Sequence, residues 1–359
     1  MDSKTPSSDT IAMEIIQHQP LREYHTFATE ATADWWINYS SAEDLQTLAR
    51  DEYFVSQPYL PIGAGSNLLF THDKYRGVIL YSQIDDLHYY DETESALTHP
   101  GQQHVRAGSG IVWDHFVELM LSRGLYGIEN LSLIPGTVGA AAIQNIGAYG
   151  SEVSQYIVAV DVVDLATGMK LRIPSALCDY RYRYSIFKDP QYHSYIVTHV
   201  HFILSTEPTC NLSYASLAKA FEGRDTMPTP EEIRQEVISI RRAKLPDPEE
   251  IPNGGSFFMN PIVPLAQYEE LAKQYDTPVP HYPTHHEGEV KLSAAWLIDQ
   301  TGLKGYRTGA VGVYEKQPLV LVNYGGATGQ EVVALAEHVQ QEVSRKFGIS
   351  LHPEVRYID

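Results

Sequence analysis

The sequence predicts an α+β protein with more than one domain. The chain has 359 residues, which is more than a single hydrophobic core usually supports. Hydrophobic residues make up 43% and charged residues 20%, a balance typical of folded rather than disordered chains. Stretches with strand-like alternation and stretches with helical spacing follow one another irregularly, unlike a regular βαβ array.

The first half of the chain contains predicted strands with few helices between them. Residues 1–25 are polar and predict a frayed N-terminus. A serine-capped helix is predicted over 40–52, and 58–70 reads as a strand, a glycine turn and a second strand. Another strand is predicted over 75–84, and 113–124 has helical spacing that ends at a glycine.

The second half repeats this mixture. Residues 156–206 alternate like strands, and 229–244 begins with Thr-Pro and predicts a helix. The Pro/Gly-rich segment 245–255 is a plausible domain boundary. Helices are also predicted over 291–302 and, with an apolar stripe, over 328–348.

Charge and composition exclude several classes of protein. The net charge of −19 argues against a nucleic-acid-binding protein, which needs a basic face. Cys178 and Cys210 are the only cysteines, so neither a disulfide framework nor a cysteine zinc site is expected. The longest apolar runs are too short to cross a bilayer and the N-terminus lacks signal-peptide features, so we expect a soluble cytoplasmic protein without membrane insertion.

Two glycine-rich stretches stand out. The chain has no GxGxxG or GxxxxGK[ST] motif, which leaves the usual nicotinamide or nucleoside-triphosphate domain unsupported. GAGSN (63–67) follows a predicted strand, and 131–150 reads LSLIPGTVGAAAIQNIGAYG without a charged residue. Small residues let a backbone approach a ligand closely, and successive N–H groups can bind an anion. These stretches suit a planar heterocycle with a pyrophosphate tail, although each could also be a tightly packed turn.

Several blocks together resemble one enzyme family. They are PIGAGSNLLF (61–70), IPGTVGAAAIQNIGAYG (134–150), YRYSIFK (182–188), KLPDP (244–248), NGGSFFMNP (253–261), KLSAAWLIDQTGLKG (291–305) and HPEVRYI (352–358). In this order they resemble the UDP-N-acetylenolpyruvoylglucosamine reductases, which use FAD and NADPH in peptidoglycan precursor synthesis. The resemblance runs from residue 25 to the C-terminus. LSYASLAKAF (212–221) is similar to the tyrosine-bearing loop of the longer subfamily.

The resemblance implies an FAD-binding fold of the vanillyl-alcohol-oxidase/PCMH type and a smaller C-terminal α+β substrate-binding domain. The implied domains are an FAD-binding region over 26–206 with two subdomains divided near 82, a tyrosine loop and connecting helix over 207–242, a substrate-binding domain over 243–325, and a C-terminal helix and strand over 326–359 that return to the FAD region. FAD would be bound non-covalently, with NADPH as co-substrate. The implied FAD-binding residues are Gly63, Ala64, Gly65, Ser66, Asn67, Gly136, Thr137, Gly139, Ala140, Asn145, Gly147 and Tyr149.

Three residues match the family's catalytic positions. Arg183 would grip the substrate carboxylate, Ser256 would donate a proton to the developing carbanion, and Glu354 would act with Arg183 on the enolate-like intermediate. Without the resemblance, the residues themselves do not favour Arg183 over Arg181. Tyr184 also stands where family members often carry Asp.

The substrate would be a UDP-sugar, and the enzyme a monomer. The residues that match substrate-binding positions, or add positive charge beside one, are Tyr214, Arg241, Lys244, Asn260, Lys304 and Gln317. Arginines and lysines converging on one ligand are informative in so acidic a chain.

Other interpretations stay open at this stage. The chain could be another flavoprotein of the same fold with a different substrate, or a flavin- or nucleotide-sugar-binding protein without activity. His281, His285 and His286 could suggest a metal site, but their proline-containing segment has no regular ligand spacing, so no metal is expected.

Overall fold

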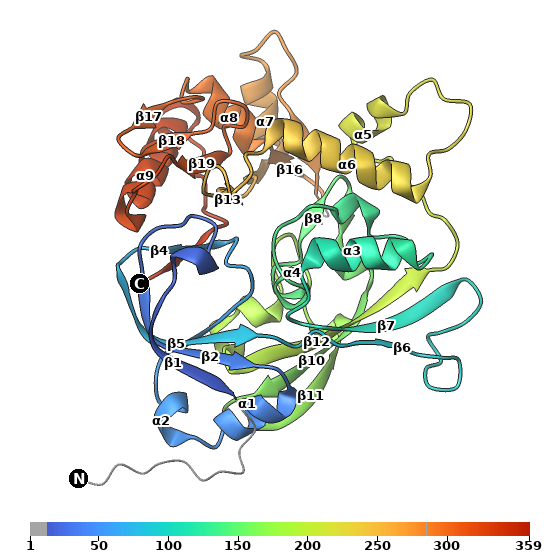
Figure 1. Ribbon diagram of the computed structural model, residues 1–359. Helices are drawn as coiled ribbons and strands as arrows, with labels where there is room; N and C mark the ends of the chain where they lie inside the picture. The colour runs from blue at the N-terminus through green and yellow to red at the C-terminus, as the bar shows by residue number, and fades with distance from the viewer. Residues whose placement is uncertain (1–12, 285) are drawn as a thin grey trace. The chain divides into compact units, whose positions relative to one another are not determined.

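A computed structural model describes residues 13–284 and 286–359 (Figure 1). The chain forms two compact units. The described part of the first unit covers 13–19, 33–63 and 76–238, and the second covers 20–32, 64–75 and 239–359. Each unit is therefore assembled from segments that are far apart in the sequence, and each is described by itself below.

The first unit contains a four-stranded sheet with the order β1-β2-β5-β3. Its strands are β1 (Glu14–Pro20), β2 (Thr32–Tyr39), β3 (Tyr59–Ile62) and β5 (Lys74–Ser82). Strands β1, β2 and β5 each extend one or two residues beyond the borders of the unit. Helices α1 (Ala42–Leu48) and α2 (Glu52–Val55) follow β2. Ile37, Leu45 and Leu80 belong to the buried cluster of this part.

Two expectations are corrected in this region. Residues 14–20 are not frayed, because they form the edge strand β1 beside β2, whose main-chain pairing does not require apolar side chains; residues 1–12 lie outside the described part. The predicted helix over 40–52 is two helices, because α1 ends at Leu48 and the Asp51 side chain accepts the N–H groups of Tyr53 and Phe54 to begin α2.

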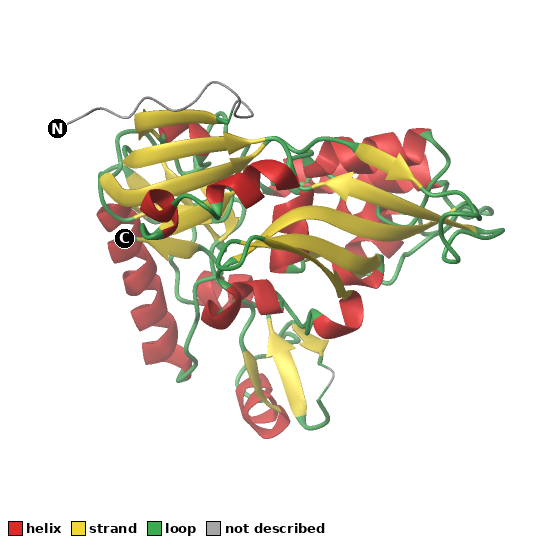
Figure 2. Ribbon diagram, turned by 90° about the horizontal axis from the view of Figure 1, so that it is seen from below, coloured by secondary structure: helices red, strands yellow, loops and turns green. Residues whose placement is uncertain are grey.

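A five-stranded antiparallel sheet follows, with the order β11-β10-β12-β7-β6. Its strands are β6 (Leu87–Tyr89), β7 (Gln102–Gly108), β10 (Ile157–Asp164), β11 (Met169–Pro174) and β12 (Tyr195–Ser205). Helices α3 (Trp113–Ser122) and α4 (Val138–Gln144) lie above these strands (Figure 1), and the long twisted strands can be followed in Figure 2. Trp113, Phe116 and Phe202 are fully buried between the helices and the sheet.

A row of polar side chains runs across this sheet from the buried His104 and His201 to the partly exposed Asp161 and the exposed Arg172. His104 Nε2 lies 3.0 Å from His201 Nδ1, and His201 Nε2 lies 2.9 Å from Asp161 Oδ2. Arg172 donates two hydrogen bonds to the same carboxylate, at 2.6 and 3.0 Å. Burial and the neighbouring His201 lower the pKa of His104 to about 4, and burial also lowers the pKa of His201. Both imidazoles are therefore neutral at pH 7.

The second unit contains a four-stranded sheet with the order β13-β19-β18-β17. Its strands are β13 (Asn253–Ser256), β17 (Arg307–Thr308), β18 (Val311–Val313) and β19 (Val320–Asn323). The same unit contains a three-stranded sheet of β14 (Ile262–Pro264), β15 (His281–Pro283) and β16 (Glu289–Leu292). It also contains a parallel pair of strands, β4 (Leu68–Phe70) and β20 (Arg356–Ile358). The helices are α7 (Leu265–Ala272), α8 (Ala294–Gln300) and α9 (Gly329–Phe347).

Most of the elements predicted here are confirmed. The apolar stripe of α9 is buried at Val332, Leu335, Ala336, Val339 and Val343. The helix α6 (Pro230–Lys244) begins and ends as predicted, and Thr229 and Glu232 exchange hydrogen bonds at its start. Helix α8 starts three residues later than predicted, because residues 289–292 pair as β16 and Ser293 caps the helix.

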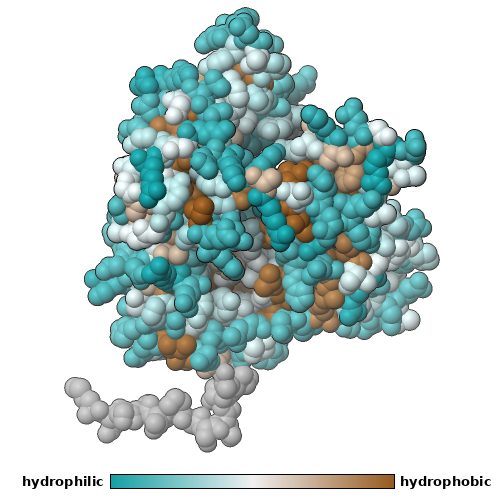
Figure 3. Space-filling model, turned by 45° about the horizontal axis from the view of Figure 1, so that its top comes forward, coloured by the Kyte–Doolittle hydropathy of each residue, from teal (hydrophilic) through white to brown (hydrophobic). Residues whose placement is uncertain are grey.

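The surface is largely hydrophilic on the face drawn in Figure 3, where hydrophobic residues form small separate groups. Among the residues that the structure describes, no helix combines the length and apolarity required to cross a membrane.

The lowered pKa values of His104 and His201 in the five-stranded sheet predict that the stability of the fold depends on pH. Between about pH 6.5 and pH 4, the unfolded chain binds a proton at residue 104 that the folded chain does not bind, so acidification favours unfolding. We expect the free energy of unfolding to fall across this range, by at most about 1.4 kcal/mol per pH unit for each such histidine. Urea unfolding at pH 7, 6 and 5 measures this. His104→Gln should flatten the dependence, whereas His72→Gln, at an exposed histidine, should not; equal slopes in both variants would contradict the assignment.

Candidate functional site

The GAGSN turn has a backbone that requires glycine at its centre. Gly65 has φ +61°, and a Cβ there would lie 2.1 Å from the carbonyl oxygen of Tyr24. The Gly65 oxygen accepts the N–H groups of Thr26 and Leu68, both at 3.4 Å. The turn is therefore pressed against the 24–26 segment of the second unit, and a larger residue would push the two apart.

This turn has the donors of an anion site. Within the described part of the chain, the N–H groups of Ala64, Gly65 and Asn67 have no hydrogen-bond acceptor. N–H groups clustered around a left-handed residue form a concave donor set that suits phosphate oxygens. The residues present thus fit one phosphate group of FAD, as the resemblance implies.

The same turn is bonded to the chain around Glu354. The Asn67 side-chain amide donates a hydrogen bond to the main-chain oxygen of Glu354 at 3.0 Å. The Arg356 N–H donates to the main-chain oxygen of Asn67 at 3.0 Å. The Glu354 N–H in turn donates to the Phe257 oxygen at 2.8 Å. Because Phe257 follows Ser256, the second unit brings together a predicted FAD-binding residue and two of the three predicted catalytic residues.

Ser256 is held at the end of β13. It is exposed and pairs with Val320 of β19, while Phe257 and Phe258 after it are buried. Before it, the buried Asn253 accepts the Gly255 N–H with its side-chain oxygen at 2.8 Å and donates to the oxygens of Pro246 and Ile251. The serine is thus an exposed hydroxyl on a fixed backbone.

The uncharged stretch 131–150 contains a helix that the sequence analysis missed. Thr137 caps α4, which lies in a stretch that was expected to bind a planar heterocycle or to form a tightly packed turn. Small residues let this helix pack closely: a Cβ on Gly139 would lie 2.7 Å from the Ser109 Cβ, and one on Gly63 would lie 2.5 Å from the Thr137 hydroxyl. Alanine-rich composition without charge was the available signal, because alanine favours helices.

Arg183 is fixed by the end of this stretch. Its guanidinium donates to the Gly147 oxygen at 2.6 Å and to the Asn145 oxygen at 3.4 Å. Arg181 instead pairs with Asp179 and lies over the Tyr184 ring. The two arginines are not on one face of a strand, because residues 181–184 form a tight turn with Arg183 at φ 54°. The structure therefore distinguishes them where the sequence did not.

Asn145 and Tyr149 have different surroundings. Asn145 ends α4 in the left-handed region and is fully buried, and its amide donates to the Arg181 oxygen at 2.8 Å while its side-chain oxygen accepts the Ser154 N–H at 3.2 Å. Its side chain is committed to the protein, so any contact with a cofactor would involve its main chain. The Tyr149 ring meets the Tyr214 ring edge to face, with centroids 5.3 Å apart.

The remaining predicted substrate residues lie in the second unit. Arg241 and Lys244 are in the last turns of α6, and Lys244 and Lys304 are exposed. The Asn260 side-chain oxygen accepts the Ala294 N–H at 2.9 Å at the start of α8, and the Gln317 side chain accepts from the Leu319 N–H. Their roles toward a substrate remain predictions. Among the described residues, no three His, Cys, Asp or Glu side chains are grouped to hold a metal; His285 lies outside them.

One ion pair in the first unit escaped the sequence analysis. Arg234 of α6 donates to both oxygens of Asp114 of α3, at 2.6 and 3.1 Å. The Asp114 carboxylate also accepts the N–H of Leu133, which has φ 57° and lies near the start of the glycine-rich stretch 131–150. Residues 120 positions apart form this contact, so no local pattern could reveal it.

Comparison with known proteins decides the family. Residues 247–358 match the model of the UDP-N-acetylenolpyruvoylglucosamine reductase C-terminal domain, and 35–173 match an FAD binding domain. A UDP-N-acetylenolpyruvoylglucosamine reductase of Porphyromonas gingivalis is 47% identical over 346 residues, which are 96% of this chain and 100% of that protein. One of Bacteroides fragilis is 44% identical over 342 residues, 95% and 99% of the two chains. The chain belongs to the UDP-N-acetylenolpyruvoylglucosamine reductase family.

Solved structures agree on the fold. The reductase of Thermus caldophilus superimposes with a TM-score of 0.65 at 23% identity and covers 97% of this chain and 99% of its own. A 6-hydroxy-D-nicotine oxidase of Arthrobacter nicotinovorans has a TM-score of 0.50 at 11% identity and covers 97% and 88%. The predicted fold class is confirmed: an FAD-binding fold of the vanillyl-alcohol-oxidase type with a C-terminal α+β domain. Family membership also favours the reductase over another flavoprotein of this fold.

The Asp114–Arg234 pair predicts a local stability effect. The Arg234 side chain is 7% exposed and that of Asp114 27%, so Arg234→Met should lower the free energy of unfolding by about 2–3 kcal/mol, because it strands a largely desolvated carboxylate. It should also weaken flavin binding, since the Asp114 carboxylate that accepts the Leu133 N–H loses the ion pair that orients it. The matched control is Arg224→Met, whose pair with Glu232 is 36% and 42% exposed and should contribute at most about 1 kcal/mol. Denaturant unfolding and flavin titration measure both variants, and equal losses would contradict the prediction.

Proposed function

We propose that this chain reduces UDP-N-acetylglucosamine enolpyruvate to UDP-N-acetylmuramate, with FAD and NADPH, in peptidoglycan precursor synthesis. The observation that carries the proposal is the bonded chain from Asn67 through Glu354 to Phe257, which brings the neighbourhood of Ser256 to the predicted phosphate-binding turn. The relatives are named as reductases of UDP-N-acetylenolpyruvoylglucosamine, which supports this choice of substrate.

The reaction requires three kinds of group from the protein. A bound FAD would supply the chemistry of hydride transfer, with NADPH as the source of the hydride and the methylene carbon of the enolpyruvyl group as its acceptor. Negative charge then develops on the adjacent carbon and spreads into the carboxylate. The protein must stabilise that charge and deliver a proton to the carbon.

Arg183 is the proposed cation for the carboxylate. Its side chain is oriented by the carbonyl oxygens of Asn145 and Gly147. A guanidinium is always charged and its planar donors match a carboxylate. Orientation before the substrate arrives lowers the cost of stabilising the developing charge.

Ser256 is the proposed proton donor, and Glu354 is the proposed partner of Arg183. A hydroxyl is a weak acid, so it must be placed close to the carbanion to be effective. The rigid backbone around Ser256, fixed by Asn253, supports that role. Glu354 has its main chain bonded on both sides, to Asn67 and Phe257, and we assign it to the enolate-like intermediate with Arg183.

The predicted binding residues complete the proposal. The nucleotide and carboxylate of the substrate would contact Tyr214, Arg241, Lys244, Asn260, Lys304 and Gln317. We further propose a cytoplasmic monomer that binds neither nucleic acid nor membrane, since the substrate is a nucleotide sugar and the chain carries a net charge of −19. Size-exclusion chromatography with light scattering tests the oligomeric state.

An anaerobic absorbance experiment tests the function. The visible flavin band of the purified protein should bleach with NADPH and return when the enolpyruvyl nucleotide is added. Recovery only with oxygen would indicate a flavoprotein with another acceptor. Repeating the titration with NADH measures the preference for the reductant.

Ser256→Ala tests the proton donor. The variant should bind flavin and be bleached by NADPH at the normal rate, because neither step needs that proton. Reoxidation by the enolpyruvyl nucleotide should slow by about 10²–10⁴-fold, the usual contribution of a general acid. Stopped-flow absorbance separates the two half-reactions, and normal reoxidation would remove Ser256 from the mechanism.

Glu354→Gln tests the carboxylate without changing its size. Because the hydrogen bonds of this residue to Asn67 and Phe257 use main-chain atoms, the variant should fold and retain flavin while substrate reduction slows. Flavin content and the unfolding midpoint provide the controls. A variant purified without flavin would instead assign Glu354 to cofactor binding.

A further inference from the structure

Asn130 connects two segments of the first unit that the proposed function uses. Its side chain is buried, with 2% of the residue exposed. The amide nitrogen donates to the Tyr149 oxygen at 2.8 Å and to the Asn211 oxygen at 2.9 Å. Both amide hydrogens are therefore used, and the two acceptors belong to chain segments more than sixty residues apart.

The first segment is the end of the glycine-rich stretch. Tyr149 has φ 48°, and its neighbour Gly150 accepts a hydrogen bond from the Asn211 side chain at 3.2 Å. The carbonyl oxygens of residues 149 and 150 are thus both bonded to the same group of asparagines.

The second segment leads directly to Tyr214. The Asn211 side-chain oxygen accepts the Ser213 N–H at 3.1 Å and the Ser213 hydroxyl at 2.7 Å. Tyr214 follows as the residue that begins α5 (Ala215–Ala220), and its ring contacts that of Tyr149. Asn130 therefore fixes both ends of the contact between these two tyrosines.

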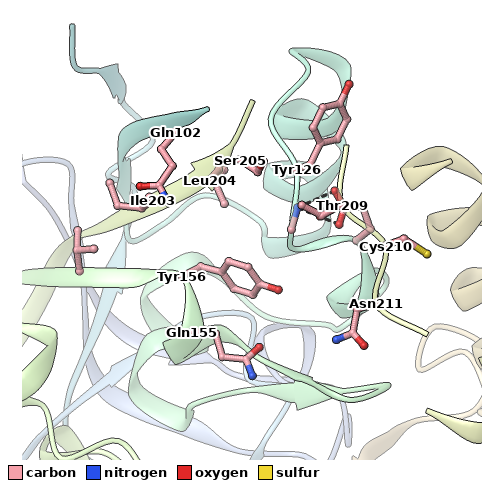
Figure 4. A pocket seen from close by; sticks show the side chains of 13 residues that line it. Gln102, Tyr126, Gln155, Tyr156, Ile203, Leu204, Ser205, Thr209, Cys210 and Asn211 are labelled. Carbon is pink, nitrogen blue, oxygen red and sulfur yellow. Dashed lines mark hydrogen bonds between the residues drawn. The ribbon is translucent and has the colours of Figure 1, made fainter. Parts of the chain in front are cut away.

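The backbone that Asn130 holds has little packing on its other side. Residues 209–211 line a cavity of about 340 Å³ (Figure 4). The opposite wall includes Gln155 and Tyr156. Because no side chains pack against residues 209–211 from the cavity, van der Waals contacts on that side do not stabilise their position. Hydrogen bonds such as that of Asn130 to Asn211 must therefore stabilise it.

Cys210 lies in this wall and provides a reporter. It is partly exposed, whereas Cys178, the other cysteine, is fully buried. A thiol reagent should therefore modify residue 210 first, at a rate that depends on how often residues 209–211 move away from Asn130.

We propose that Asn130 is a positioning residue for substrate binding. It acts through the Asn211 main chain and holds residues 209–214, the first part of the tyrosine loop, against the end of the glycine-rich stretch. Tyr214 is then in place when the nucleotide binds. The inference rests on the proposed role of Tyr214 in substrate binding. It follows that replacing Asn130 should lower the affinity for the substrate, although the Asn130 side chain is buried.

Asn130→Asp is the main test. The variant keeps the size of the side chain and removes both amide donors, so that a carboxyl group faces two carbonyl oxygens. We expect KM for the enolpyruvyl nucleotide to rise roughly 10- to 100-fold, the effect of losing two hydrogen bonds. Flavin content and the rate of flavin reduction under saturating NADPH should be retained, and Cys210 should react faster with a thiol reagent.

Three controls accompany the test. Gln274→Glu makes the same amide-to-carboxyl change at an exposed residue and should alter neither KM nor thiol reactivity. Cys210→Ser provides the blank for the labelling. If Asn130→Asp does not fold, Asn130→Ala replaces it, because this variant removes the same two hydrogen bonds without introducing a charge; it should change both readouts in the same direction.

Tyr214→Ala separates this inference from the proposed function. If Tyr214→Ala raises KM but the folded Asn130→Asp changes neither KM nor Cys210 reactivity, the positioning role is overturned. If Tyr214→Ala leaves KM unchanged, the proposed role of Tyr214 fails, and with it the effect on affinity. Cys210 reactivity still decides whether Asn130 holds the loop, since that readout does not depend on what Tyr214 binds.

Discussion

The parallel pairing of β20 with β4 is the constraint on which the second unit depends. Residues 356–358 lie in register with 68–70, and Thr71 extends the pairing through two hydrogen bonds to the Ile358 oxygen, at 2.8 and 3.1 Å. This closes a loop of nearly 290 residues, whose entropic cost must be offset by the contacts it allows. One such contact is that of Glu354 with Asn67, which exists because the two strands fix their neighbours.

The first unit uses close packing of small residues for a similar purpose. Helix α4 approaches Ser109 and residue 63 so closely that no side chain fits at Gly139 or Gly63. Its C-terminal end then supplies the carbonyl oxygens that orient Arg183. Absence of charge in this stretch thus has two explanations, since it suits the packing of a helix as well as a flavin surface. Close packing was foreseen only as that of a turn, not as that of a helix.

Buried polar groups connect elements that hydrophobic contacts alone would leave free to slide. Asp114 links α3, α6 and Leu133, and Asn130 links the glycine-rich stretch to the tyrosine loop. Both amide hydrogens of the buried Asn130 and both carboxylate oxygens of the partly buried Asp114 have partners, as polar groups removed from water require. These hydrogen bonds fix the positions of the glycine-rich stretch and of residues 209–214, which contain predicted binding residues.

The sequence by itself determined the fold class, the helices with clear caps and apolar stripes, such as α6 and α9, and the family, through motifs distributed over the whole chain. These features follow from local periodicity or from residue identity, which a linear reading can detect. It missed α4, the edge strand β1 and the short strands between residues 253 and 323, since their hydrogen-bonding partners rather than their side chains define them. Only the tertiary structure showed that Arg181 and Arg183 have different partners, and only it joined Asn67 to Glu354 and Asn130 to Asn211. The reason is that hydrogen bonds between distant carbonyl and amide groups leave no pattern in the order of the residues.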